Sequence, residues 1–276
     1  MGKMRRMQKW IRRLSLCGAI WLLLWAQNQL LQSETITVRT QIPTAFSGLR
    51  ITVLADLHGA VFGPDNRELI RVVQQTKPDL IAICGDFADM QYDPAMIQTM
   101  TSKLCAVAPV YYVTGNHEWA ARIVKPLTAQ LTAAGVTVLA NDYVVLERAG
   151  ERLVLAGVHD PNGPRDMKTP RQLAAEIKKA EGNLPTILLA HRNDRLEEYA
   201  ACGFSVVLCG HGHGGVWRLP WVGGLLGPGG AWRPFYDAGV YRQKNTIQVV
   251  SRGLGRAKWL LRLGNRPQVL TVVLES

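Results

Sequence analysis

Apolar runs that alternate with helical segments restrict the fold of this chain more than any other feature of its sequence. The runs are short, rich in β-branched residues and followed by polar residues; they lie at 49–54, 80–84, 110–113, 186–189 and 204–209. Segments with helical periodicity lie at 66–76, 94–104, 122–134 and 170–180. We also expect a strand at 35–40 and a hairpin that pairs 142–148 with 152–158. These patterns predict an α/β domain with largely parallel sheets covered by helices.

The polar residues that follow the predicted strands are of a restricted kind. Eight of them carry side chains suited to metal binding or catalysis: Asp56, His58, Asp86, Asn116, His117, His191, His211 and His213. Five of the six histidines of the chain are in this set, and scattered surface histidines would not be sorted in this way. Because ligands of open α/β sheets bind beyond the carboxyl ends of the strands, we expect these side chains to converge on one site.

The ligand types in this set indicate metal chemistry. Carboxylate, amide and imidazole groups without a thiolate disfavour a structural zinc knuckle and suit Mn²⁺, Fe or Zn²⁺. So many candidate ligands exceed what one ion with an open position needs, and they are sufficient for two. Two ions about 3.5–4 Å apart that share a carboxylate and a water are suited to in-line attack on phosphorus. The sequence therefore predicts a centre with two divalent ions.

The N-terminal segment has a composition of its own. Residues 14–26 form an uncharged apolar run of 13, preceded by six cations: Lys3, Arg5, Arg6, Lys9, Arg12 and Arg13. The run is short for a spanning helix and about right for a signal sequence, but no clean small-residue cleavage site follows it. We expect an uncleaved, single-pass signal-anchor in residues 1–33, with a catalytic domain at 34–276 on the extracytoplasmic side of the cell membrane. The alternatives are a twin-arginine signal and an amphipathic tether on the cytoplasmic leaflet.

Charge and cysteine content limit the partners. The formal net charge is +11, and the six N-terminal cations account for more than half of it. The modestly basic remainder suits an anionic substrate or membrane surface, and no nucleic-acid-binding signature is evident. The five cysteines show no C-x-x-C spacing, which indicates free thiols rather than a disulfide framework.

The order of the motifs resembles that of the calcineurin-like metallophosphoesterase superfamily. The five matching blocks are Asp56-Leu57-His58, Gly85-Asp86, Gly115-Asn116-His117-Glu118, the lone His191, and Gly210-His211-Gly212-His213. The resemblance extends from about Arg50 to the C-terminus. Segments 236–239 and 250–255 are similar to the bacterial branch of membrane-associated or exported phosphodiesterases, whose members typically carry an N-terminal signal or anchor.

This resemblance implies a fold and a set of residue roles. The fold would be a β-sandwich of two mixed sheets flanked by helices, which refines the largely parallel arrangement expected from periodicity. Asp86 would bridge two metal ions, of which the first is held by Asp56, His58 and His213 and the second by Asn116, His191 and His211. His117 would be the catalytic histidine, which is not a metal ligand and stabilises the transition state or protonates the leaving oxygen.

Three positions depart from the pattern of this branch. Arg192 follows His191 where a Glu-Pro-Asp or Asn-Pro-Asp run is more common, and it would bind a substrate phosphate or point to solvent. His159 stands where a carboxylate is common, and we leave it out of the metal set. Glu118 replaces a frequent Asp. None of these changes removes a ligand, so the catalytic set is complete.

Three further features have alternative interpretations. Asp89 would support the bridging carboxylate or cap the following turn. The glycine-rich loop 221–232 contains Trp221 and Trp232 and would be a flap over the substrate, a lipid-facing tip or a loop packed on the sheet edge. The basic segment 258–262 would be a membrane-contacting edge or a strand with solvated charges.

We therefore expect a membrane-anchored enzyme with two divalent ions that hydrolyses a phosphodiester or phosphoanhydride bond by attack of a metal-bridging hydroxide. The apolar anchor and loop favour a lipid or cell-envelope substrate. A pyrophosphate hydrolase of the UDP-2,3-diacylglucosamine type and a nucleotide phosphodiesterase are the alternative enzymes. A binding module that keeps the metals without turnover is the alternative class, and the intact His117 argues against it.

Overall fold

The computed structural model describes residues 2–257 and 260–276, and its centre is a sandwich of two six-stranded sheets. The first sheet has the order β1-β14-β2-β3-β4-β5, from strands Gln32–Arg39, Gln268–Glu275, Arg50–Leu54, Leu80–Cys84, Val110–Val113 and Thr137–Val138. The second has the order β12-β13-β9-β8-β7-β6, from Gly239–Gln243, Thr246–Val250, Val206–Cys209, Thr186–Leu189, Glu151–Gly157 and Asp142–Arg148. A short ribbon pairs β10 (Arg218–Leu219) with β11 (Gly223–Gly224).

Both sheets are mixed. Strands β2 to β5 run parallel, as do β7, β8, β9 and β13, and these parallel sets contain the five strands predicted from apolar runs. Antiparallel pairing joins β14 to β2, β12 to β13, and β6 to β7. The mixed sandwich implied by the family resemblance is confirmed, as is the predicted hairpin of β6 and β7. The largely parallel arrangement expected from periodicity is wrong at the β14–β2 and β12–β13 pairs.

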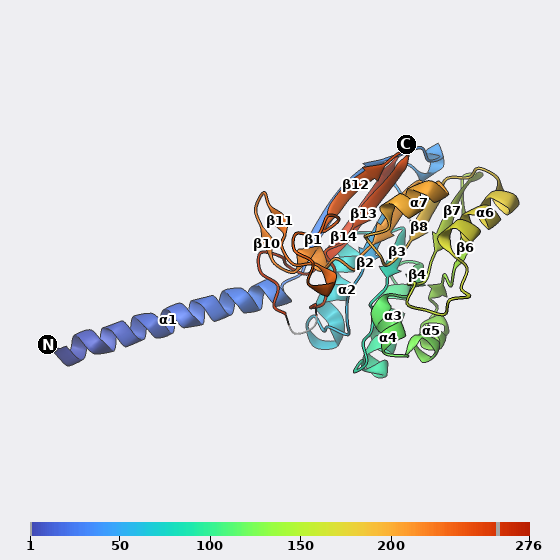
Figure 1. Cartoon of the computed structure of the whole chain (residues 1–276). Helices are drawn as coiled ribbons and strands as arrows, with labels where there is room; N and C mark the ends of the chain where they lie inside the picture. Colours follow the sequence, from blue (N-terminus) through green and yellow to red (C-terminus); the bar gives the residue numbers. More distant parts are fainter. Residues whose placement is uncertain (1, 258–259) are drawn as a thin grey trace.

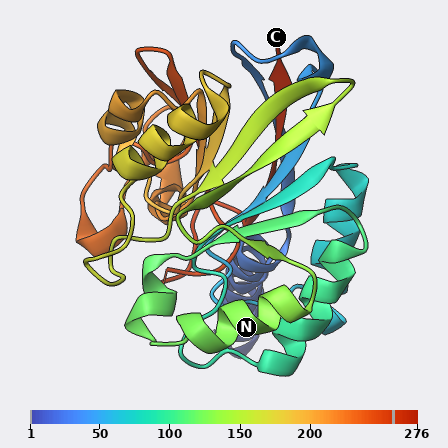
Figure 2. The same ribbon diagram turned by 90° about the vertical axis from the view of Figure 1, so that its right-hand side faces the viewer.

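The sandwich has one apolar core between the sheets and one on each outer face. Alternate residues of β2 and β3, such as Val53 and Ala82, meet inward-facing Leu155 and Leu208 of the second sheet. Helices α2 (Arg67–Gln75), α3 (Pro94–Cys105) and α5 (Val124–Ala133) cover the first sheet, whereas α6 (Pro170–Glu181) and α7 (Leu196–Cys202) cover the second. Figure 2 shows these two groups of helices on opposite sides of the strands.

Local signals explain where the helices begin. Asp93 accepts a hydrogen bond from the Ala95 N–H at the start of α3, and a proline occupies its first position. Thr169 and Gln172 form a reciprocal capping box at the start of α6. The short helices are α4 (Asn116–Ala120) and the 3-10 turns η1 (Thr44–Phe46), η2 (Pro64–Asn66), η3 (His213–Gly215) and η4 (Pro228–Gly230).

Helix α1 (Gly2–Gln29) extends away from the sandwich and meets it only at its C-terminal end (Figure 1). Most of its apolar side chains, including Ile11, Leu14 and Trp21, are exposed, whereas Asn28 is buried. Within residues 2–257 and 260–276, no helix combines the length and apolarity needed to cross a membrane, and the predicted signal-anchor is not confirmed. Strand β1 begins at Gln32, just before the predicted domain start at residue 34.

The C-terminal part of the chain differs most from expectation. Strands β12, β13 and β14 were not predicted, although β14 pairs with both β1 and β2 at the first sheet. In the predicted basic edge 258–262, Lys258 and Trp259 lie outside the described residues. The rest of this segment is neither a strand nor a solvated charged surface, because Arg262 is only 1% exposed.

Candidate metal centre

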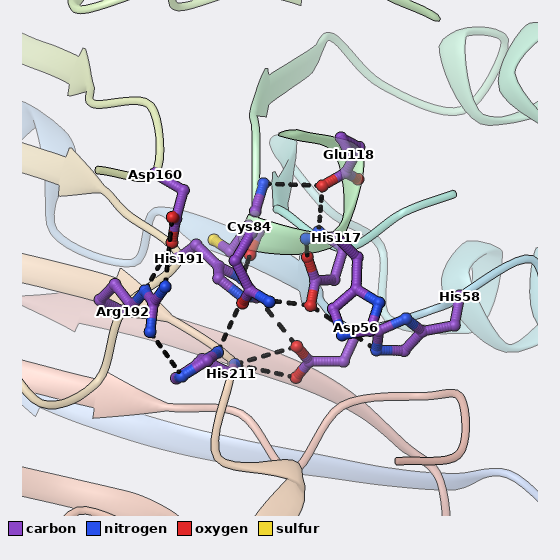
Figure 3. Close-up of polar contacts among 12 residues, drawn as sticks. Asp56, His58, Cys84, His117, Glu118, Asp160, His191, Arg192 and His211 are labelled. Carbon is purple, nitrogen blue, oxygen red and sulfur yellow. Dashed lines mark hydrogen bonds and ion pairs between the residues drawn. The ribbon is translucent and has the colours of Figure 1, made fainter. Parts of the chain in front are cut away.

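The eight predicted site residues lie just beyond the carboxyl ends of five strands that belong to the parallel parts of the sheets. Figure 3 shows the side chains of Asp56, His58, His117, His191 and His211 gathered at this place. Asp56 and His58 follow β2, Asp86 follows β3, and Asn116 and His117 follow β4. The second sheet supplies His191 after β8, and His211 with His213 after β9. The parallel pairing of these strands places the turns side by side, which is why residues far apart in the sequence meet.

Asp56, His58 and His213 form one cluster, in which one ligand atom of each residue lies within 4.8 Å of the others. The Nε2 atoms of His58 and His213 are 3.2 Å apart, and their rings stack with centroids 5.0 Å apart. The carboxylate of Asp56 also accepts the backbone N–H of His211, at 2.9 Å from Oδ1 and 3.0 Å from Oδ2. This contact ties the first sheet to the histidine turn of the second sheet.

Asp86, His191 and His211 form a second cluster of the same kind. The Nδ1 of His191 lies 2.9 Å from the Cys84 carbonyl, which can only accept, so its Nε2 is the nitrogen that faces the cluster and can bind a cation when the ring is neutral. Three further potential ligand atoms surround this Nε2: His211 Nδ1 at 3.1 Å, Asn116 Oδ1 at 3.1 Å and Asp86 Oδ2 at 3.3 Å. Such a set of potential ligand atoms around one point fits a cation.

Asp86 lies between the two clusters. Its Oδ2 is 3.3 Å from the Nε2 of His191 in one cluster and 3.7 Å from the Nε2 of His58 in the other. Its Oδ1 accepts the backbone N–H of His117 at 2.8 Å, which fixes the orientation of the carboxylate. The structure thus brings the seven predicted ligands together as two groups that meet at one shared carboxylate.

The electrostatics of the second cluster also fit a cation. Burial opposes a charge on His191, yet Asp86 and Asp56 outweigh this effect and raise the pKa of His191 to about 10. The two buried carboxylates therefore attract positive charge strongly. In contrast, burial together with the neighbouring His191 and Arg192 lowers the pKa of His211, so this imidazole is neutral and has a lone pair for coordination.

The turns that carry these ligands have an uncommon backbone conformation. Five of the seven candidate ligands have φ between 46° and 66°, in the left-handed region: Asp56, His58, Asp86, His211 and His213. Single residues with side chains of this kind tolerate that region better than most, but it still costs energy. Gly85 and Gly115 allow two of these turns to touch, because a Cβ on Gly85 would lie 2.6 Å from the Gly115 nitrogen.

Glu118 is a structural residue of the site that sequence reasoning treated only as a departure from the family pattern. Its fully buried carboxylate accepts the backbone N–H groups of Asp86, Phe87, Ala88 and Gly115 at 2.6–3.3 Å. Burial and the neighbouring Asp86 raise its pKa to about 7. Glu118 therefore joins the turn after β3 to the turn after β4.

His117 lies beside the first cluster and is only partly exposed. Its Nδ1 is 3.3 Å from Asp89 Oδ1, and the other oxygen of Asp89 is 3.3 Å from the Nδ1 of His58. The hydrogen bond that His117 donates to Asp89 raises the pKa of His117, which favours the protonated ring. Of the two interpretations of Asp89, the structure favours a supporting role, but the residues that it supports are His117 and His58 rather than Asp86.

Arg192 is held in place by Asp160, a residue that the sequence analysis missed. The Nε and Nη2 atoms of Arg192 donate to the two oxygens of the buried Asp160 carboxylate at 2.6 and 3.3 Å (Figure 3). Nη1 of Arg192 is 3.0 Å from the Nε2 of His211. The guanidinium thus faces the second cluster instead of solvent, and the sequence signal that could have revealed this is the acidic residue that follows His159.

Arg262 supports the histidine turn from behind. Its buried guanidinium donates to the carbonyls of Gly255 and Arg252 at 2.8 Å and to the carbonyl of His213 at 3.4 Å. Asn265 donates to the same His213 carbonyl at 2.7 Å. Burial lowers the pKa of Arg262 to about 10, so the group remains a cation at neutral pH.

Two predicted features lie outside the clusters. His159 accepts the Thr114 N–H at 3.3 Å through Nδ1 and packs edge-on against Trp119, and burial lowers its pKa to about 4. It belongs to none of the three groups of potential metal ligands found among the described residues. The loop 221–232 does not pack its aromatic residues on the sheet edge, because Trp221 and Trp232 are 102% and 68% exposed.

Comparisons with known proteins agree with this geometry. Residues 49–215 match the family described as calcineurin-like phosphoesterase. The chain is 32% identical to the phosphodiesterase YaeI of Escherichia coli strain K12, over 80% of both chains. It is 27% identical to the metallophosphoesterase YkuE of Bacillus subtilis strain 168, over 91% of this chain and 88% of the relative. A Danio rerio transmembrane protein with a metallophosphoesterase domain is also 27% identical, over 86% of this chain and 55% of that protein.

Proposed function

Because this chain belongs to the calcineurin-like phosphoesterase family, we propose that it is a dinuclear-metal enzyme that hydrolyses a phosphodiester or phosphoanhydride bond. Metal-dependent phosphoester hydrolysis follows from the family. The observation that carries the finer proposal is the meeting of two ligand clusters at Asp86, whose Oδ2 lies within 4 Å of an imidazole nitrogen from each cluster.

The proposed metal assignment follows the two clusters. Asp56, His58 and His213 would hold one divalent ion, and Asn116, His191 and His211 would hold the other, with Asp86 shared between them. Bound divalent ions would supply acidification of water and neutralisation of phosphate charge. The mixed oxygen and nitrogen donors suit Mn²⁺, Fe or Zn²⁺.

His117 is the proposed proton donor to the leaving oxygen. Its Nδ1 proton is held by Asp89, so the ring presents its other nitrogen to the substrate side. The hydrogen bond to Asp89 raises the pKa of His117, which favours the protonated ring. The second oxygen of Asp89 contacts His58, so one carboxylate orients a metal ligand and the proton donor together.

Arg192 is the proposed contact for a non-reacting phosphate oxygen. A neutral imidazole has one lone pair, so His211 cannot both coordinate through Nδ1 and accept a hydrogen bond at Nε2. When Nδ1 is used as a ligand, Nη1 of Arg192 loses its partner on His211 but stays close to the cluster, because Asp160 holds the rest of the guanidinium. That donor is then available to an anionic substrate.

Helix α1 is the proposed membrane attachment, which would place the enzyme at the cell membrane. Exposed apolar residues recur at spacings of three and four on one side of its first half: Met4, Met7, Ile11 and Leu14. Most of the cations in this half fall on the opposite side, and basic amphipathic helices of this kind bind anionic lipid surfaces. A membrane-bound enzyme with exposed tryptophans in loop 221–232 suits an amphiphilic substrate such as a lipid or cell-envelope intermediate. The other interpretation of this segment, a signal-anchor in residues 1–33, would place the catalytic domain on the extracytoplasmic side of the membrane.

Metal counting combined with hydrolysis of bis-p-nitrophenyl phosphate tests the catalytic proposal. We expect two Mn²⁺ ions per chain and turnover that is lost on chelation and restored by Mn²⁺. Two bound ions without turnover of phosphodiester or pyrophosphate substrates would instead indicate a metal-stabilised binding module.

Co-sedimentation with vesicles that contain anionic phosphatidylglycerol tests the membrane proposal. The full chain should bind, and the Ile11→Glu/Leu14→Glu variant should lose most of this binding. Val240→Glu changes an exposed apolar residue in β12 and serves as the control. Equal binding by the double variant and the control would contradict attachment through α1.

A further inference from the structure

A pocket of about 330 Å³ lies between the metal clusters and the base of helix α1, and we refer to it as the α1 pocket. Its metal-centre side includes His58 and Asp89, and its opposite side includes Asn28 and Gln29 from the last turn of α1. Ala60, Val61, Phe62, Leu254, Gly255 and Arg256 complete the lining. The volume lies in the range of small-ligand sites and equals that of about ten waters.

The position of the α1 pocket relates it to the leaving group of the reaction. Asp89 lines the α1 pocket, and its Oδ1 lies 3.3 Å from the Nδ1 of His117, the proposed proton donor. A group that leaves phosphorus must depart next to its proton donor. The pocket that opens beside the His117–Asp89 pair is therefore placed to receive the leaving group.

The walls of the α1 pocket differ in chemistry. Val61, Phe62 and Leu254 form an apolar part, whereas the exposed guanidinium of Arg256 provides a positive charge at the rim. Val61 is 49% exposed, so apolar surface is left open to a ligand. A leaving group with an apolar body and an anionic end would match both parts, and an alkyl or aryl phosphate released from a pyrophosphate diester has this character.

The α1 wall is held firmly in place. The side chain of Asn28 pairs with the backbone of Arg262, accepting its N–H at 2.9 Å and donating to its carbonyl at 3.1 Å. Gln27 accepts the Gly264 N–H at 2.6 Å. Since the Arg262 guanidinium also donates to the Gly255 carbonyl, the last turn of α1 and the wall at Gly255 are connected through one residue.

We infer that the α1 pocket is the leaving-group subsite and that it takes a leaving group with an apolar body and an anionic end. The inference rests on the proposed function, since it needs His117 as the proton donor. It gives helix α1 a second role, as a wall of the substrate site. Arg256 and Val61 become residues that determine specificity.

A pair of matched valine substitutions tests the position of the subsite. Val61→Trp fills the α1 pocket, and Val240→Trp places the same side chain at a similarly exposed valine, 41% against 49%, in β12. We expect Val61→Trp to raise KM for bis-p-nitrophenyl phosphate at least tenfold. Inhibition by inorganic phosphate, which needs only the metal centre, should change less than twofold. A KM equal to that of Val240→Trp, or an equal loss of phosphate affinity, would overturn the inference.

A pair of arginine substitutions tests the charge, and it remains informative if Val61→Trp does not fold. Arg256→Gln should lower kcat/KM about tenfold for P1,P2-diphenyl pyrophosphate, whose leaving group is phenyl phosphate. The same variant should change kcat/KM less than twofold for bis-p-nitrophenyl phosphate, whose leaving group is a phenol. Arg242→Gln, on the exposed strand β12, should change neither. Equal effects of Arg256→Gln on both substrates would overturn the charge assignment.

Different results would contradict the proposed function and the assignment of the α1 pocket. If the wild-type chain binds two ions and hydrolyses neither substrate, the proposed function fails. If the wild-type chain hydrolyses both substrates while Val61→Trp and Arg256→Gln behave like their controls, only the α1 pocket assignment fails.

Discussion

The two sheets contribute opposite chemistry to the metal centre. Of the seven candidate ligands, both carboxylates and the amide come from the first sheet, whereas the second sheet supplies only imidazoles. The buried side chains that support the two halves also differ, because one accepts hydrogen bonds and the other donates them. Glu118 accepts backbone N–H groups of the first half, and Arg262 donates to backbone carbonyls behind the second.

This contrast has a common physical reason. Each half is made of tight turns whose buried backbone groups cannot all pair with one another, and a buried unpaired polar group costs about 1–3 kcal/mol. A turn that leaves N–H groups inward needs an acceptor, and a turn that leaves carbonyls inward needs a donor. The two halves meet these needs with an anion and a cation, and together they place ligands of both kinds around one point.

The largest expected effect distinguishes the shared carboxylate from a single imidazole. Asp86→Ala should remove both ions and lower kcat more than about 1,000-fold, because its carboxylate lies between the clusters. His211→Ala should remove only the ion of the second cluster. Metal content measured after dialysis tests this. Loss of one ion in both variants would show that Asp86 is not shared, and Asp166→Ala in an exposed loop serves as the control.

The second-largest expected effect is a loss of catalysis without a loss of metal, at the part of the centre that the first sheet supplies. His117→Ala should keep both ions and lower kcat by about 100- to 10,000-fold, the usual range for loss of a positioned proton donor. The remaining activity should be higher for substrates with acidic leaving groups such as p-nitrophenol, since these need no proton. Steady-state kinetics with nitrophenyl and alkyl diesters measure this. A near-normal kcat for both substrates would remove His117 from the mechanism.

A third comparison concerns the two buried supports. Glu118→Gln replaces an acceptor of four N–H groups by a side chain whose amide end donates, so we expect a loss of about 2–4 kcal/mol in the free energy of unfolding. Arg262→Met should cost a similar amount, because carbonyls of Gly255 and Arg252 lose their donor. Urea unfolding of both variants tests whether Glu118 and Arg262 contribute similarly to the free energy of unfolding. Glu147→Gln, at an exposed position, serves as the control.

The smallest effect is a pH dependence outside the clusters. His159 has a folded-state pKa of about 4, below its ordinary value of 6.5, because burial opposes its charge. As pH falls below 6.5 the unfolded chain gains a proton that the folded chain does not take up, so stability falls until pH reaches about 4. Between pH 7 and pH 4.5, the free energy of unfolding of His159→Gln should therefore fall by about 2 kcal/mol less than that of the wild type. Urea unfolding of the metal-free proteins at both pH values measures the difference, and parallel pH profiles would contradict it.

Periodicity predicted the strands before residue 210 better than those of the C-terminal part. Strands β3, β4 and β8 begin and end where their apolar runs predict, because these runs are buried on both faces. Strands β12, β13 and β14 were missed, and β14 pairs with β1 and β2 from the other end of the chain. Pairing between such distant segments depends on the closed sandwich and leaves no local pattern.

The sequence by itself determined which side chains form the candidate centre. Asp56, Asp86 and the histidines follow strands, and parallel strands bring their carboxyl ends to one edge, so order and residue type were enough to group them. Only the tertiary structure decided how they are supported. Arg262 has the sequence context of a surface cation, and it is buried because the carbonyls of Gly255 and Arg252 and the carbonyl of His213, which is 49 residues away in the sequence, converge on it. Asp89, Asp160 and the α1 pocket likewise depend on contacts between elements, which a linear pattern does not contain.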